Sequence, residues 1–342
     1  MASVTRVALC GVGRVGRDVT RLLSARPGYR VVAAYSRNPR IIGQDLGTCA
    51  GTRSLGVTVS GDRTAALSEP ADVLVVATTS FLRDVAGDVR AGIERGMNVM
   101  TTAEEAAFPW LIDAELTGQL DALAKKHGVS VIGVGLNPGF IFDALLLTLT
   151  GVAWDVERVR MRRVVDVSRF SAAIQRRLGI GFSADEFQRG VESGAISGHI
   201  GFPQTFSLIS KCLGRTLSHI DKSFEPLLAA QEHTNDHMRV SAGQTAGFIQ
   251  RVSGHADDTV WLEAEFIAHI APESAGLIAE DRILVDGYNS VGLVISPGCN
   301  PQRGSAAMIA NCIPRVVEAR PGFITVADLA LPHAHMTAAG FR

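Results

Sequence analysis

Three glycines near the start of the chain have the spacing of a nucleotide-binding turn. Gly11, Gly13 and Gly16 form the pattern Gly-x-Gly-x-x-Gly, between a short apolar run, Val7 to Cys10, and a helical pattern. In such a turn the first glycine bends the chain, the second lets a pyrophosphate approach, and the third packs helix on strand. The helix N-terminus adds free N–H groups and a positive dipole end. The alternative is an ordinary glycine turn. We expect a dinucleotide to be bound by Gly11, Gly13, Arg14, Val15 and Gly16.

Two adjacent carboxylates could carry acid–base chemistry. Glu104 and Glu105 follow an expected strand, Asn98 to Thr102, with Ala103 between. Ligands of open α/β sheets bind at the carboxyl ends of the strands, so this segment should face the reacting end of the cofactor. Neighbouring residues point in different directions, so at most one carboxylate is expected to face the site. The alternative is that both acids only stabilise a helix dipole, at about 0.3–1 kcal/mol.

The residues after the second expected strand indicate which cofactor is bound. Ser36 and Arg37 occupy the place where an NAD site usually carries an acid. A hydroxyl and a guanidinium suit the 2′-phosphate of NADP instead, although Arg37 and Arg40 could simply be solvated turn residues. NADP(H) is therefore favoured, and NAD(H) stays possible. Further residues expected at the cofactor are Asn38, Thr78, Thr79, Ala103, Asn137 and Pro138.

A shaped turn, Gly133 to Gly139, ends the last expected strand of this series. Apolar side chains follow it and could line a pocket, although phenylalanines mostly fill cores. His199, flanked by glycines, is the best polar pocket candidate further along. No His, Cys or Asp group has the spacing of metal ligands and no nucleophile motif occurs, so we expect neither a metal site nor a covalent mechanism. The residues expected in a substrate pocket are Leu136, Phe140, Ile141, Phe142, Phe170 and His199.

The elements that must position these residues alternate between strand and helix. Short apolar runs and amphipathic segments follow one another from residue 7 to residue 133, which predicts a Rossmann-type, doubly wound parallel sheet of five or six strands. Long strands without intervening helices come next, and they predict a second, α+β domain on a largely antiparallel open sheet. Ser183 and Glu186 form a capping box that should begin a helix there. The expected strands are Val156–Val167, Met238–Val240, Thr259–Ile270 and Arg282–Ile295.

We therefore expect three segments. Residues 1–140 form the dinucleotide-binding domain, 141–301 the substrate and dimerisation domain, and 302–342 a helix and tail that return to the first domain.

Composition excludes several classes of protein. The 342 residues carry 33 Lys and Arg against 34 Asp and Glu, which gives no electrostatic case for nucleic acid or an anionic membrane as partner. The five scattered cysteines indicate reduced thiols. No apolar run reaches the ~18 residues of a membrane span, and the first strand begins too early for a signal peptide. We expect a cytoplasmic protein.

The order of the motifs resembles the 2,4-diaminopentanoate dehydrogenase family, which includes native NAD(P)H-dependent amine dehydrogenases and has the dihydrodipicolinate-reductase-like fold. The resemblance implies one catalytic glutamate after the fifth strand, which we assign to Glu104 with Glu105 as the second choice. It also implies a homodimer formed through the sheet of the second domain. The motifs are GVGRVG, TTAEEAAFP, GLNPGFIFD, GHIGFP and NCIPRVVEARPGFITVADL.

The chain departs from relatives of this group in ways that bear on the substrate. It lacks the paired histidines and nearby lysine of dihydrodipicolinate reductases, and the rim lysine of a homoserine dehydrogenase. No cationic set for an amino-acid carboxylate is identified, while the residues around the Asn137 turn are apolar. The hypothesis is an amine dehydrogenase that catalyses the reversible reductive amination of a small apolar ketone or aldehyde with ammonia to a primary amine. The alternatives are a diamino acid dehydrogenase and a non-catalytic NADP-binding sensor.

Overall fold

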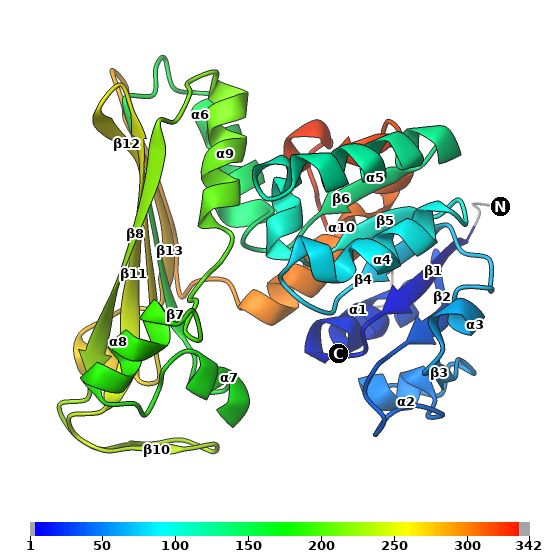
Figure 1. Ribbon diagram of the computed structural model, residues 1–342, viewed down its shortest axis with the longest axis horizontal. Coiled ribbons are helices and arrows are strands. Elements are labelled where there is room, and N and C mark those ends of the chain that lie inside the picture. Colours follow the sequence, from blue (N-terminus) through cyan, green and yellow to red (C-terminus); the bar gives the residue numbers. More distant parts are fainter. Residues whose placement is uncertain (1–3, 335–342) are drawn as a thin grey trace. The chain divides into compact units, whose positions relative to one another are not determined.

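A computed structural model describes residues 4–334, and these form two compact units (Figure 1). The first unit contains the described residues up to Leu145 and those from Asn300 onward. The second unit is Leu146–Cys299. In the described part of the chain, no helix is both long and apolar enough to cross a membrane.

The first unit is built on a seven-stranded sheet in which every pair of neighbours is parallel. All four residues of its central strand β4 are buried, as expected for a strand covered on both faces. Strand order is β15-β6-β5-β4-β1-β2-β3. The strands are β1 (Thr5–Cys10), β2 (Tyr29–Tyr35), β3 (Val59–Ser60), β4 (Val73–Val76), β5 (Asn98–Thr101), β6 (Ser130–Gly133) and β15 (Gly322–Ile324).

Helices cover both faces of this sheet. On one face α4 and α5 pack together, and on the other α1 packs against α10 (Figure 1). Because side chains alternate along a strand, Ala8, Cys10, Leu74 and Val76 share the core under α4. The helices are α1 (Arg14–Ser24), α2 (Leu46–Ala50), α3 (Arg63–Ala66), α4 (Leu82–Ile93), α5 (Ala114–His127) and α10 (Pro301–Val317), with short turns η1 (Glu104–Ala107), η2 (Pro109–Leu111), η3 (Phe140–Leu145) and η5 (Val326–Asp328).

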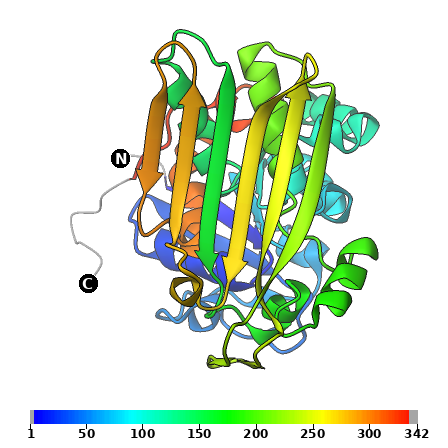
Figure 2. The same ribbon diagram turned by 90° about the vertical axis from the view of Figure 1, so that its left-hand side faces the viewer.

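The second unit is built on a six-stranded sheet of order β14-β13-β7-β12-β11-β8. Neighbours β7 and β12 are parallel, and the other pairs are antiparallel. Its helices lie on one face, and Figure 2 shows the other face bare. The elements are α6 (Leu146–Thr150), β7 (Arg158–Asp166), α7 (Ala172–Arg177), α8 (Ala184–Glu192), α9 (Phe202–Leu213), β8 (His219–Leu228), β9 (His233–Thr234), β10 (Arg239–Val240), β11 (Thr245–Ala256), β12 (Thr259–His269), η4 (Pro272–Ala275), β13 (Glu280–Asp286) and β14 (Val291–Ile295).

The predicted fold class is confirmed, with differences in detail. The capping box is present, since the Ser183 hydroxyl accepts from the Glu186 N–H and opens α8. The expected single strand Arg282–Ile295 is instead the hairpin of β13 and β14. Strands β8 and β11 were not predicted, because β8 is an edge strand rich in polar residues and Gly247 and Gly254 interrupt the apolar pattern of β11.

Candidate active site

The glycine turn of the first unit divides into two packed glycines and an open one. A Cβ on Gly11 would lie 2.3 Å from Ala77 O, and one on Gly16 would lie 2.1 Å from Gly11 O. A Cβ on Gly13 would have no atom within 4 Å. Gly13 is also the N-cap of α1, where it offers no side chain to the first N–H groups of the helix. The open space and uncapped N–H groups fit the pyrophosphate of a dinucleotide.

The adjoining residues of this turn lie where a cofactor could reach them. Arg14 is exposed and Val15 is half-buried in the first turn of α1. Thr78 follows β4 next to the glycines, since its Cγ2 would lie 2.9 Å from a Cβ on Gly11. Thr79 is half-buried, and its hydroxyl lies 3.3 Å from Asp84 Oδ2. Their contact with the cofactor stays a prediction.

The end of β2 carries a buried hydroxyl, Ser36 Oγ. It accepts from the Asn38 N–H at 3.2 Å, which leaves its own proton for another acceptor. Asn38 Oδ1 in turn accepts from the Arg40 N–H at 3.1 Å and shapes the turn. Arg37 follows Ser36 and its side chain is exposed. A hydroxyl and a cation are therefore side by side at this end of the sheet.

Two guanidinium groups meet at one buried carboxylate beside this turn. Asp88 of α4 is 1% exposed, and its Oδ1 lies 2.9 Å from Arg63 Nη1. Its Oδ2 lies 3.9 Å from Arg37 Nη2. A hydrogen bond with Tyr35 and the charge of Asp88 raise the pKa of Arg37. Arg63 and Asp88 were not predicted from the sequence, because they come from other helices and no spacing signal links them to Arg37.

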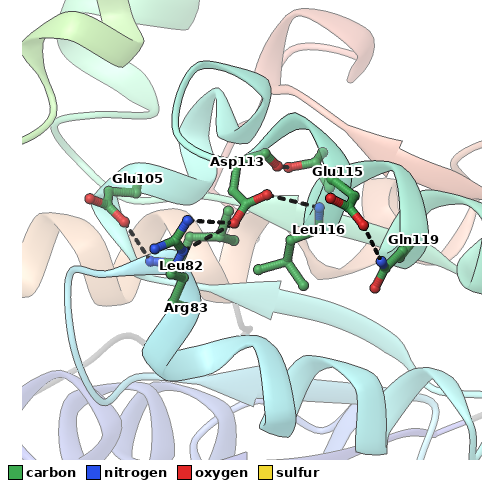
Figure 3. Close-up of polar contacts among 8 residues, drawn as sticks. Leu82, Arg83, Glu105, Asp113, Glu115, Leu116 and Gln119 are labelled. Carbon is green, nitrogen blue, oxygen red and sulfur yellow. Dashed lines mark hydrogen bonds and ion pairs between the residues drawn. The ribbon is translucent and has the colours of Figure 1, made fainter.

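The two glutamates after β5 have different partners. Glu104 Oε1 accepts from the Ser80 hydroxyl at 2.8 Å, and its side chain is half-buried. Glu105 Oε2 accepts from the Leu82 N–H at 2.7 Å, at the first residue of α4 (Figure 3). Glu105 therefore caps α4, whose N-cap residue Phe81 makes no side-chain cap. Ser80, which orients Glu104, was not among the predicted site residues.

Two further contacts fix the segment that carries the glutamates. Arg83 donates from Nε and Nη2 to Asp113 Oδ2, at 3.0 and 2.9 Å, and Asp113 Oδ1 caps α5 by accepting from the Leu116 N–H at 3.0 Å (Figure 3). The hydrogen bond from the Leu116 N–H, followed by the bonding to Arg83, holds the pKa of Asp113 below its ordinary value. On the sheet side, a Cβ on Gly133 would lie 2.2 Å from the Ala106 carbonyl carbon. Only glycine at this position of β6 lets η1 pack so closely.

The turn after β6 contains a buried acceptor. Gly139 has φ +128°, and its N–H donates to Asp143 Oδ2 at 2.6 Å. Pro138 is buried. Asn137 Oδ1 is also buried, and no hydrogen bond from the described residues satisfies it. A buried acceptor of this kind fits a ligand that brings an N–H donor. Ala103, also predicted at the cofactor, is buried before η1.

The residues predicted for the substrate pocket lie in both units. Leu136, Ile141 and Phe142 are buried in the first unit, and Phe140 is half-buried. Leu136 packs under α10, where a Cβ on Gly304 would lie 2.8 Å from its Cδ2. The pocket role of these four residues stays a prediction.

Two of the predicted pocket residues belong to the second unit. Phe170 packs against the core of that unit. The backbone of His199 is clamped by the Gln250 amide, with bonds of 2.7 and 2.8 Å, and its ring packs edge-on against Phe202. Their contact with the substrate likewise stays a prediction.

Comparisons with known proteins cover almost the whole chain. Residues 140–340 match the 2,4-diaminopentanoate dehydrogenase C-terminal domain, and residues 5–99 match the dihydrodipicolinate reductase N-terminus. The chain is 32% identical to a 2,4-diaminopentanoate dehydrogenase of Acetoanaerobium sticklandii, over 97% of this chain and 95% of the relative. It is 23% identical to an amine dehydrogenase of Streptomyces virginiae, over 94% and 95%. A solved structure of an amine dehydrogenase from Mycobacterium smegmatis superposes with a TM-score of 0.86 at 26% identity, covering 97% and 98% of the two chains.

Proposed function

Because the chain belongs to the 2,4-diaminopentanoate dehydrogenase family, we propose that it interconverts a small apolar ketone or aldehyde and ammonia with a primary amine. The resemblance inferred from the sequence motifs is confirmed, and the protein is an oxidoreductase of the amine dehydrogenase type that uses NAD(P)(H). The substrate, the preference for NADP(H) and the roles of single residues form the proposal developed below.

The observation that supports this reaction most directly is the different bonding of the two glutamates. Glu105 caps the N-terminus of α4, where its carboxylate accepts a hydrogen bond from the Leu82 N–H. Glu104 is oriented by a hydroxyl from Ser80 and is half-buried at the carboxyl end of β5. Ligands of parallel sheets bind at this end. We assign the acid–base role to Glu104 and a positioning role to Ser80.

The proposed chemistry needs a group that can both take and return a proton. Ammonia adds to the carbonyl carbon to form a carbinolamine, which loses water to form an iminium ion. Glu104 takes a proton from ammonium, returns one to the departing hydroxyl, and stabilises the positive iminium by its charge. Acid–base assistance of this kind is worth about 10²–10⁴ in rate. The bound cofactor would supply the hydride that reduces the iminium carbon to the amine.

The residues around the glycine turn would hold the cofactor. The open side of Gly13 and the N-terminus of α1 suit the pyrophosphate, with Arg14 as a further cation. The buried Asn137 Oδ1 would accept from the carboxamide of the nicotinamide. Asn137 and the glycine turn lie in the same unit, so both ends of one cofactor can be tested by substitutions there.

The preference for NADP(H) is proposed from charge at the end of β2. Arg37 and Arg63 together carry one more charge than Asp88 cancels, and the Ser36 hydroxyl has a proton to donate. This set is complementary to a 2′-phosphate, which binds best through charge-assisted hydrogen bonds. An NAD site would instead carry a carboxylate at this turn to accept from the ribose hydroxyl.

A second candidate is a dehydrogenase of a diamino acid. It is favoured by the identity to the Acetoanaerobium sticklandii protein, which exceeds that to the Streptomyces virginiae protein over a similar length. The apolar residues Leu136, Ile141 and Phe142 around the Asn137 turn favour the simple carbonyl substrate instead.

The direct test is an assay of NADPH oxidation by the purified chain. We expect oxidation that depends on both ammonium and a short ketone or aldehyde, with the primary amine detected as product. Reduction of NADP⁺ by 2,4-diaminopentanoate, without activity on simple carbonyls, would favour the second candidate. An absence of turnover with either class of substrate would refute both.

We also propose that two copies of the chain pair through the bare face of the six-stranded sheet (Figure 2). This face carries acids and bases in alternation, including Arg162 between Glu265 and Glu280. Such a pattern can complement a second copy of itself. Light scattering should give the mass of a dimer at micromolar concentration, and a monomer mass would contradict the proposal.

A further inference from the structure

Three potential metal ligands meet on the second unit, at one end of the pair formed by β8 and β11. The register places His219 of β8 directly opposite His255 of β11. Asp221 lies two residues along β8 and therefore on the same face as His219, because side chains alternate along a strand. No metal site was expected from the sequence, since the linear spacing of these residues does not show that the sheet register brings them together.

The distances within this cluster match those between the ligands of one ion. Asp221 Oδ2 lies 3.3 Å from His219 Nε2 and 3.2 Å from His255 Nε2. A charge-assisted hydrogen bond is usually shorter, at about 2.7–2.9 Å. Two ligands of a tetrahedral Zn²⁺ with bonds of about 2.0–2.1 Å are separated by about 3.3 Å. The imidazole rings stack at 4.0 Å, and the ligand atoms of all three residues lie within 4.8 Å of one another.

A neighbouring serine orients one of the imidazoles for metal binding. The Ser218 hydroxyl lies 3.1 Å from His255 O, to which it can donate, and 3.2 Å from His219 Nδ1. With the proton of His219 on Nδ1, Ser218 Oγ accepts it and the Nε2 lone pair is available to a metal ion. Metal-binding histidines are commonly oriented in this way by a hydrogen bond at the other ring nitrogen.

The alternative is that the Nε2 atoms of His219 and His255 each carry a proton and no metal ion is bound. Each neutral imidazole would then donate its Nε2–H to Asp221 Oδ2, at distances longer than the usual N–H···O hydrogen bond of about 2.9–3.0 Å. A divalent cation would satisfy both Nε2 lone pairs and the carboxylate together.

We propose that His219, Asp221 and His255 bind a divalent transition-metal ion, for which Zn²⁺ is the best match, with the fourth position taken by water. Imidazole and carboxylate ligands suit Zn²⁺, whereas Mg²⁺ and Ca²⁺ prefer oxygen ligands alone. The ion joins the edge strand β8 to β11, so it stabilises this end of the sheet by binding only the folded chain. It has no part in the proposed dehydrogenase chemistry.

Zinc binding by the full-length protein tests the inference independently of its activity. The chain is freed of metal with a chelator and titrated with Zn²⁺ against a chromogenic competitor. We expect the unmodified chain to bind one Zn²⁺ ion per chain. His255→Gln and Asp221→Asn should lose this ion or bind it at least about 10-fold more weakly. Ser218→Ala keeps all three ligands and should weaken binding by about 10-fold or more. His237→Gln removes an exposed imidazole of the same unit and should bind as the unmodified protein does.

Thermal unfolding provides a second readout, because each protein is compared with itself in the presence and absence of Zn²⁺. Zn²⁺ should raise the unfolding midpoint of the unmodified chain and of His237→Gln, and should leave that of His255→Gln unchanged. If the unmodified chain binds no Zn²⁺, the cluster holds protons and the inference is wrong. Equal affinity in the unmodified chain and in Asp221→Asn would also overturn it.

Discussion

Polar residues come together in different ways in two regions of the molecule. One region is the carboxyl end of the parallel strands in the first unit, and the other is the bare sheet face of the second unit. In the first unit, two adjacent residues have different partners: Glu105 caps α4, while Glu104 accepts a hydrogen bond from the Ser80 hydroxyl. In the second unit, residues far apart in sequence converge, as His219 and His255 do through strand register. The residue types that follow parallel strands can therefore be interpreted from local sequence, whereas their partners, like the contacts on a sheet face, require knowledge of the tertiary structure.

Both units contain a buried carboxylate paired with an arginine, and this pairing differs from that of the proposed catalytic carboxylate. In the second unit, Arg163 and Asp281 form an ion pair with side chains only 3% and 2% exposed, and Asp281 also accepts from the Cys299 N–H. In the first unit, Asp88 is 1% exposed and pairs with Arg63, whereas the carboxylate proposed to do chemistry is only half-buried. Substitution of the half-buried carboxylate should thus change activity, and substitution within a buried ion pair should change stability.

The largest effect is expected from Glu104→Gln. Loss of the proposed acid and base should lower kcat by about 10²–10⁴-fold, because the amide can neither take nor return a proton. NADPH binding, measured by fluorescence titration, should be unchanged. Glu105→Gln is the matched control and should retain most of the turnover. If Glu105→Gln loses activity and Glu104→Gln does not, the roles of the two carboxylates are the reverse of those proposed.

The next largest effect is expected on stability, from Asp281→Ala. Removing one partner of a buried ion pair leaves the Arg163 charge without compensation, which costs about 3–5 kcal/mol. Urea unfolding followed by circular dichroism should show the loss. Glu225→Ala breaks an exposed pair with Arg251 in the same sheet and should cost less than about 1 kcal/mol. Equal losses in the two variants would contradict the contrast between buried and exposed charge.

A smaller effect is expected from Arg37→Ala on cofactor choice. The variant should lower kcat/KM for NADPH by about 10-fold or more, since a hydrogen bond to a charged group such as the 2′-phosphate is worth about 1.5–3 kcal/mol. The value for NADH should change little. Arg40→Ala removes an exposed arginine of the same turn and serves as the control. A parallel loss with both cofactors would argue against recognition of the phosphate.

The smallest effect is expected from Glu105→Ala. Loss of the bond to the Leu82 N–H should destabilise the first unit by about 1 kcal/mol, as the loss of a helix cap does. Turnover should stay within a few-fold of the unmodified enzyme. Glu115→Ala, which removes only an exposed contact with Gln119 in the same region, should cost about 0.2–0.5 kcal/mol (Figure 3). An unchanged unfolding midpoint in Glu105→Ala would show that the cap contributes nothing.

Much of the fold was predictable because strong local signals agree with it. Helix α5 has clear local boundaries, since Asp113 and Gly128 cap its two ends. The helix expected in residues 302–342 corresponds to α10, Pro301–Val317. Strand β8 was missed because its exposed edge carries polar residues, so no apolar alternation marks it. In the candidate site, Arg63, Asp88 and Ser80 were missed because each acts through a partner on another element.

The dinucleotide fold, the glycine turn and the carboxylate pair at the end of β5 all follow from the amino-acid sequence alone. These features depend on residues that are neighbours along the chain, where spacing and strand or helix period carry the information. Only the tertiary structure decided that Glu105 caps α4, that Arg37 and Arg63 share Asp88, and that His219 and His255 meet at Asp221. Each of these depends on packing or strand register, which a local pattern does not encode.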